Sequence, residues 1–99
     1  MTIKIQSIHF DADKKLIAFI EERVNKLSHF YDGIVSSEVY LKLEKSSNTE
    51  NKIVEIKLMI PGSDIFASKH NKTFEEAVTG TIDALESQLK KHKERIKGL

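Results

Sequence analysis

The chain of 99 residues has no cysteine, no tryptophan and only one proline. Without cysteine it can form no disulfide, no iron–sulfur cluster and no thiolate zinc site. No apolar run approaches the roughly 20 residues of a membrane-spanning helix, and Met1 is not followed by the basic and then apolar segments of a signal peptide. We therefore expect a cytoplasmic protein with no membrane partner.

The motifs of catalysis are also missing. Four glycines are present, but none forms a phosphate-binding loop, and neither a nucleophile elbow nor a paired-carboxylate motif occurs. Four histidines are scattered along the chain, and no two have the i, i+4 or HExxH spacing of a zinc site; they are His9, His29, His70 and His92. The sequence predicts no enzyme, no cofactor, no metal and no small-molecule substrate.

What is present fits one globular domain over residues 1–99, with 39% hydrophobic and 31% charged residues. The formal net charge of +1 hides a polarised chain. Residues 87–99 carry five cations and one acid, hence +4, whereas residues 1–86 carry eleven cations and fourteen acids, hence −3. The five cations are Lys90, Lys91, Lys93, Arg95 and Lys97. This cluster exceeds what a helix end needs to balance its dipole, which favours each cation there by roughly 0.3–1 kcal/mol.

The cluster ends a predicted helix that runs from Thr73 to Leu99. Its apolar residues recur at steps of three and four, as on the buried stripe of an α-helix; they are Phe74, Ala77, Val78, Ile82, Leu85, Leu89 and Ile96. Thr73 can cap the helix, with Glu76 completing a capping box. We expect this helix to pack on the core.

The rest of the chain alternates between strand and helix periodicity. We expect strands at 2–8, 35–44, 53–60 and 65–69, a helix capped by Asp11 or Asp13 that ends near Asp32-Gly33, an exposed mobile loop at 45–51 and a turn at 61–64. In the 35–44 strand, Val39, Leu41 and Leu43 are predicted to face inward.

This β-α-β-β-β-α order predicts an α+β fold like that of double-stranded-RNA-binding domains, a four-stranded sheet with two long helices packed on one face. The other face should be open and should carry Lys4, Gln6, Tyr40, Lys42, Glu44, Glu55, Lys57, Met59, Phe66 and Ser68. On the first helix, Arg23 and Lys26 lie three residues apart on one face, where they can frame a phosphate-binding groove with the basic end of the last helix.

Three segments, together with the element order, resemble the ribosome hibernation-promoting factor and ribosome-associated inhibitor A family: NKLSHFYDGIVSSEVYLKLEK (25–45), PGSDIFAS (61–68) and TIDALESQLKKHKERIK (81–97). The resemblance implies a bacterial, non-enzymatic protein that binds ribosomal RNA of the small ribosomal subunit between head and body. There such proteins occlude messenger RNA and the A- and P-site transfer RNAs during stationary phase or stress. They favour inactive stored ribosomes or ribosome dimers.

Carried onto matching positions, the resemblance assigns phosphate contacts to seven residues: Arg23, Lys26, Lys91, His92, Lys93, Arg95 and Lys97. Lys90 joins them as a neighbouring cation. The chain departs from the family pattern at Ala84 and Ser87, where basic residues are often found, and at Thr79, where an Asp is common. Lys90, Lys69 and Lys72 are candidates to compensate. The given sequence stops right after the last helix, as the short members of the family do, and we expect the chain to be of this short type.

Two other functions stay open at this point. A free double-stranded RNA-binding module also packs two helices on an antiparallel sheet, although its cations gather at the start of the last helix rather than at its end. A protein-interaction module could instead dimerise through the open sheet face, where Phe66, Met59 and Tyr40 are the large side chains.

Overall fold

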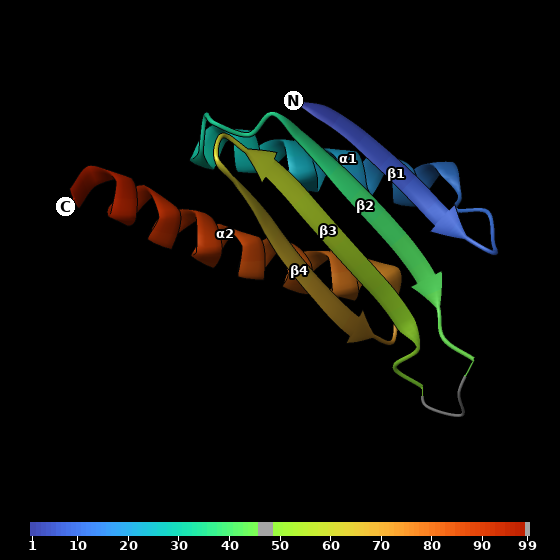
Figure 1. The fold of residues 1–99 in the computed structure, drawn as a ribbon. Coiled ribbons are helices and arrows are strands. Elements are labelled where there is room, and N and C mark those ends of the chain that lie inside the picture. Colours follow the sequence, from blue (N-terminus) through green and yellow to red (C-terminus); the bar gives the residue numbers. More distant parts are fainter. Residues whose placement is uncertain (46–48, 99) are drawn as a thin grey trace.

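The computed structural model describes residues 1–45 and 49–98, with no side chains described for 96–98. Its elements are β1 (Thr2–Ile8), α1 (Lys14–Phe30), β2 (Ser36–Leu43), β3 (Lys52–Ile60), β4 (Ser63–Asn71) and α2 (Phe74–Gly98). The predicted order and fold class are confirmed. Figure 1 shows the four strands as one layer with both helices on the same side of it.

The strands lie in the order β1-β2-β3-β4, with β1 parallel to β2 and the other neighbours antiparallel. α1 is the crossover that a parallel β1–β2 pair requires. Strand β4 is longer than predicted, 63–71 instead of 65–69, because the turn at Pro61-Gly62 is so tight that pairing starts at once. Gly62 has a φ of 78°, the left-handed conformation that glycine adopts without strain.

Each helix begins at a cap that the sequence contains. Of the two candidate aspartates, Asp13 is the cap of α1, and its side chain accepts a hydrogen bond of 2.8 Å from the Leu16 amide. Thr73 caps α2 in the same way, accepting a 3.1 Å bond from the Glu76 amide. α1 ends at Phe30, slightly earlier than predicted, because Tyr31 takes an extended conformation.

The core lies between the sheet and the helices. It is formed by one face of α1 (Leu16, Ile20, Val24, Leu27), one face of α2 (Ala77, Val78, Ile82, Leu85, Leu89) and the facing rows of the strands (Val39, Leu41, Val54, Ile56, Leu58, Ile60, Ile65, Ala67). The stripe predicted for α2 is thus buried as far as Leu89, and Phe74 packs at its edge. The side chain of Ile96, the last member of the predicted stripe, lies outside the described residues.

One core prediction is wrong. Leu43 is 45% exposed. The reason is its place at the last position of β2, because β1 ends opposite Lys42 and leaves Leu43 with a neighbour on one side only. Glu44, predicted on the open face, lies just beyond the strand, and its amide bonds to the Asn51 carbonyl at 2.9 Å. Residues 46–48 of the predicted mobile loop lie outside the described residues.

The open face of the sheet carries paired charges. Lys42 contacts Glu55 at 3.0 Å, Lys57 contacts Asp64 at 3.5 Å, and the Tyr40 hydroxyl donates to Glu38 at 3.2 Å. That hydrogen bond, with the negative charge of Glu38, raises the pKa of Tyr40. The face is therefore largely neutralised by its own side chains.

Candidate nucleic-acid interface

The last turns of α2 run on past the β3–β4 turn, as Figure 1 shows. Here we define the basic end of α2 as residues 90–95, which hold Lys90, Lys91, His92, Lys93 and Arg95. The last described core residue of the helix, Leu89, immediately precedes it. No apolar burial is described beyond Leu89, so the cations are carried on a helix end that projects from the core.

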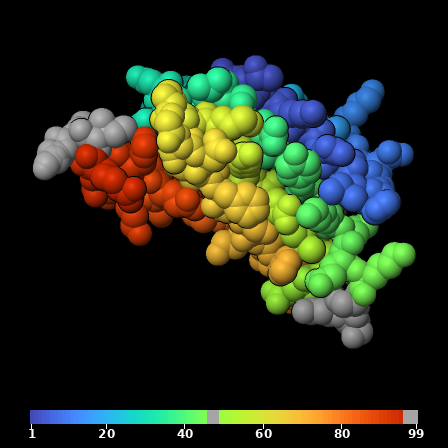
Figure 2. All heavy atoms as spheres, viewed as in Figure 1, coloured from blue at the N-terminus to red at the C-terminus, as the bar shows by residue number. Residues whose placement is uncertain are grey.

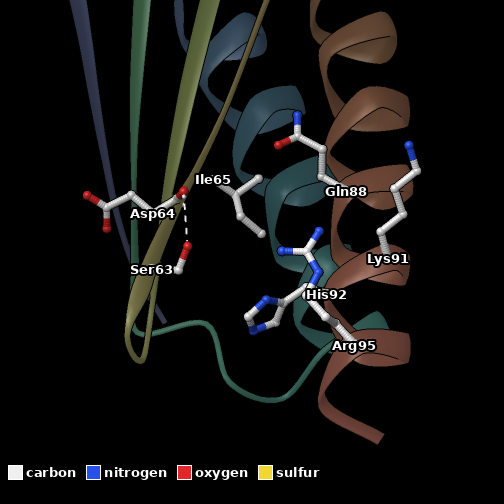
Figure 3. Close-up of a pocket in the computed structure, with 7 residues that line it drawn as sticks. All are labelled: Ser63, Asp64, Ile65, Gln88, Lys91, His92 and Arg95. Atoms are coloured by element: carbon white, nitrogen blue, oxygen red, sulfur yellow. Dashed lines mark hydrogen bonds between the residues drawn. The ribbon is translucent and has the colours of Figure 1, made fainter. Parts of the chain in front are cut away.

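A pocket of about 200 Å³ lies between the basic end and the start of β4. It is lined by Ser63, Asp64, Ile65, Gln88, Lys91, His92 and Arg95. In Figure 3 the side chain of Arg95 runs along α2 toward Gln88, the His92 ring points toward the hairpin, and Lys91 points away from the strands. Figure 2 shows atoms of this end of α2 at the surface, next to the hairpin.

The charge of this pocket is positive and not neutralised. The one acid in its lining, Asp64, is paired with Lys57 on the open face. Within the part of the chain that the structure describes, neither Lys91 nor Arg95 has a carboxylate at ion-pairing distance, and both are exposed. Two free cations one helical turn apart are suited to successive phosphates or to one doubly charged group.

Gln88 fixes the geometry of the pocket. Its side-chain amide donates a 2.9 Å hydrogen bond to the carbonyl of Phe66 on β4, so the hairpin is tied to α2 one turn before His92. We did not select Gln88 or Ser63 as site residues from the sequence. The signal was available for Gln88, since it is the glutamine of the motif IDALxxQLxKHKxxxK on which the family resemblance depends.

Lys93 and His92 also contact the C-terminal end of α1 and the residue that follows it. The Lys93 ammonium donates to the Phe30 carbonyl at 3.2 Å and lies 5.5 Å from the centre of the Phe30 ring. The His92 ring meets the Tyr31 ring edge-on, with 5.6 Å between centres. His92 Nε2 is buried and has no hydrogen-bond partner among the described residues. These contacts join the basic end to the C-terminal end of α1.

The two α1 residues predicted to contact phosphate, Arg23 and Lys26, already make contacts within the protein. Arg23 lies 4.8 Å from the centre of the Phe19 ring, and Lys26 pairs with Glu22 at 3.4 Å across one turn. The second pair is solvent-exposed, so it holds the lysine only weakly. Lys26 lies one turn before Phe30, about 6 Å along the helix. The side chain of Lys97 lies outside the described residues.

In the described ranges, 1–45 and 49–98, no three His, Cys, Asp or Glu side chains come together where they could hold a metal ion. No helix within those same ranges is long and apolar enough to cross a membrane.

The chain is similar to several known proteins. A family model described as sigma 54 modulation protein / S30EA ribosomal protein matches residues 3–97. The chain belongs to this S30EA family. Among its curated relatives, the ribosome hibernation promoting factor of Pseudomonas putida is 29% identical over 99 residues, covering 100% of this chain and 93% of that protein. The protein of the same name from Escherichia coli K12 is 30% identical over 97 residues, covering 98% of each chain.

Two solved structures of similar fold extend the comparison. A ribosomal subunit interface protein from Coxiella burnetii has a TM-score of 0.83 at 25% identity, covering 94% of this chain and 98% of that one. The N-terminal domain of Thermus thermophilus Protein Y has a TM-score of 0.80, covering 93% and 99%; at 22% identity it supports the fold alone. The family resemblance identified from the sequence is confirmed.

Proposed function

We propose that this S30EA-family protein is a ribosome hibernation factor. It acts as one ribosome-binding domain, seated on ribosomal RNA in the decoding channel of the small subunit, between head and body. The observation that carries the proposal is the unneutralised pair Lys91 and Arg95 on a projecting helix end, in a chain whose curated relatives are named ribosome hibernation promoting factors.

The proposed mechanism is steric. The folded domain fills the space that messenger RNA and the A- and P-site transfer RNAs need, and no bond is made or broken. Binding is driven by cations that neutralise phosphates and release counterions. If about six phosphates are neutralised, the logarithm of the affinity falls with the logarithm of salt concentration at a slope of about −4 to −5. Inactive ribosomes, single or as dimers, are then stored through stationary phase or stress in the cytoplasm.

Ala84 and Ser87 stand where basic residues are common in the family, but another cation lies close to one of these positions. Ala84 packs at the edge of the core, and Ser87 is exposed with its hydroxyl bonded to the Asp83 carbonyl at 3.3 Å. Lys69, however, lies along α2, with its Cγ only 3.4 Å from where a Cβ on Gly80 would be. Gly80 is one turn before Ala84, so Lys69 can supply a cation close to that position.

Sedimentation on sucrose gradients tests the proposal. Purified protein is mixed with ribosomes and with separated subunits at low and at high salt, and compared with the double variant Lys91→Glu/Arg95→Glu. The control is Lys4→Glu/Lys45→Glu, which changes the net charge equally at two exposed residues, one on β1 and the other just after the end of β2. We expect wild type and control to migrate with the small subunit and whole ribosomes at low salt, and the Lys91/Arg95 variant to stay at the top.

Three outcomes would contradict the proposal. Comigration that survives reversal of Lys91 and Arg95 would show that the basic end is not the anchor. Tight binding to an isolated RNA duplex, with no preference for ribosomes, would favour the free RNA-binding module instead. No comigration even at low salt would direct the search to a protein partner on the open face, where Phe66 is 52% exposed.

A further inference from the structure

The cations of the basic end are not equivalent. Lys91 and Arg95 are exposed and make no ion pair or hydrogen bond within the described part of the chain. Lys93 is half-buried and uses its ammonium group in two contacts with Phe30, a residue 63 positions away in the sequence. A phosphate can bind Lys91 and Arg95 without breaking any contact within the protein. To bind Lys93, it would have to break the contacts that Lys93 makes with Phe30.

Those two contacts have a clear physical basis. Phe30 is the last residue of α1, and the last carbonyls of a helix have no partner within it. They also form the negative end of the helix dipole, which attracts a cation. The aromatic face of Phe30 attracts the same ammonium. Lys93 therefore caps α1 from a different element.

The neighbouring residue strengthens this junction. His92 packs edge-on against Tyr31, the residue that follows α1, and the Tyr31 ring in turn lies against Gly33. The Tyr31 amide bonds back to the Leu27 carbonyl at 2.9 Å, so this ring is carried on a fixed backbone. A second pocket, lined by His29, Phe30, Tyr31, Asp32, Gly33 and Lys93, marks the seam between the two helices. Among the described side chains of residues 90–95, His92 and Lys93 make the hydrogen bond and the ring contacts that tie this segment to the end of α1 and to Tyr31.

We infer that Lys93 is a positioning residue rather than a phosphate contact. Together with His92 it locks the basic end of α2 to the C-terminal end of α1, and so holds Lys91 and Arg95 in the orientation that binds RNA. The inference rests on the proposed function and deepens it. A helix end fixed in advance binds more tightly because less conformational freedom is lost on binding.

Salt dependence separates the two roles. Each phosphate contact that is removed makes the slope of log affinity against log salt shallower by about one unit, whereas loss of a positioning contact weakens binding at every salt concentration without changing the slope. We compare Lys93→Met, which keeps an unbranched apolar stem, with the matched variant Lys91→Met and with the conservative variant Lys93→Arg. The measurement is the affinity for purified small subunits over a range of potassium chloride concentrations.

For Lys91→Met we expect a slope shallower by about one unit. For Lys93→Met we expect an unchanged slope with affinity roughly three- to tenfold lower throughout, from the loss of a cation at a helix end and over a ring. Lys93→Arg should restore the affinity, since arginine can make both contacts. A slope for Lys93→Met that falls like that of Lys91→Met, or an affinity equal to wild type, would overturn the inference.

Amide hydrogen exchange of the free protein gives a second, ribosome-independent test. Exchange of the amides at 91–95 should be faster in Lys93→Met than in wild type, and unchanged in Lys91→Met. Equal exchange in all three proteins would overturn the positioning role. If wild type failed to bind small subunits at all, the proposed function would fail, and this exchange measurement would still decide whether Lys93 locks the helix end.

Discussion

Gly33 is the residue at which a single methyl group should report on the junction between the helices. A Cβ built on it would lie 2.6 Å from Cε2 of the Tyr31 ring, and 3.0 and 3.1 Å from Cζ and the hydroxyl oxygen. The ring has His92 as its edge-on partner, so moving it away from Gly33 disturbs that contact. Gly33 does not have a positive φ, so the backbone at this position tolerates alanine and adds no strain of its own.

The cost of Gly33→Ala follows from two opposing effects. Forcing an extra methyl into a packed site costs about 1–3 kcal/mol. The smaller conformational freedom of alanine in the unfolded chain returns about 0.4–1 kcal/mol. We therefore expect a net loss of about 1–2 kcal/mol, which for a domain of this size corresponds to a fall in Tm of roughly 5–15 °C.

Gly80→Ala is the matched control. Gly80 lies inside α2, and its added Cβ would meet only the flexible side chain of Lys69, at 3.4 Å from Cγ. Alanine is favoured over glycine inside a helix by about 0.5–1 kcal/mol, so this variant should be more stable than wild type. Both free energies are measured by urea unfolding followed by circular dichroism. If Gly33→Ala were as stable as wild type, or if Gly80→Ala lost stability by as much, the packing described here would be refuted.

Two further predictions concern α1 and the open face. Asp13→Ala removes the cap that accepts a hydrogen bond from the Leu16 amide, and it should lower the free energy of unfolding by about 1 kcal/mol. Asp13→Asn should keep most of the cap's contribution to stability, because asparagine can accept the same hydrogen bond. Equal thermal melts for the two variants would count against the cap. Glu38→Gln should lower the raised pKa of Tyr40 toward its usual value of about 10, as followed by ultraviolet absorbance titration with Tyr40→Phe as the blank. Because the folded-state pKa is the higher one, the contribution of this pair to stability is present below about pH 10 and is lost as pH rises through the folded-state pKa; a pKa unchanged in Glu38→Gln would refute its cause.

Much of the fold was predictable because it depends on local patterns. The buried stripes of α1 and α2 are visible as apolar residues at helical spacing, and the caps at Asp13 and Thr73 are residue types that accept from helix amides. Local pattern alone did not choose between Asp11 and Asp13, since both have the same cap chemistry. Nor did it place Leu43, whose exposure depends on where the neighbouring strand stops.

The candidate site was predictable in content but not in arrangement. Charge and the family resemblance select Lys91, Lys93 and Arg95 as equal members of one cluster. Their different roles arise from how α2 crosses α1, which brings Lys93 to Phe30 and leaves Lys91 and Arg95 free. Likewise, Asp64 comes close to the cations only in the folded chain. The β3–β4 register is needed to show that Lys57 pairs with this acid. Such long-range pairings have no signature in periodicity.

The proposed occupation of the decoding channel is tested most directly by competition. The affinity of the protein for purified small subunits is measured alone and with saturating messenger RNA and transfer RNA. Because binding free energies of two ligands are reciprocally coupled, mutual exclusion requires the protein to weaken the binding of those RNAs as much as they weaken its own. We expect the affinity to fall by at least tenfold when both RNAs are bound. An unchanged affinity, with protein, messenger RNA and transfer RNA held on the same subunit, would contradict the account.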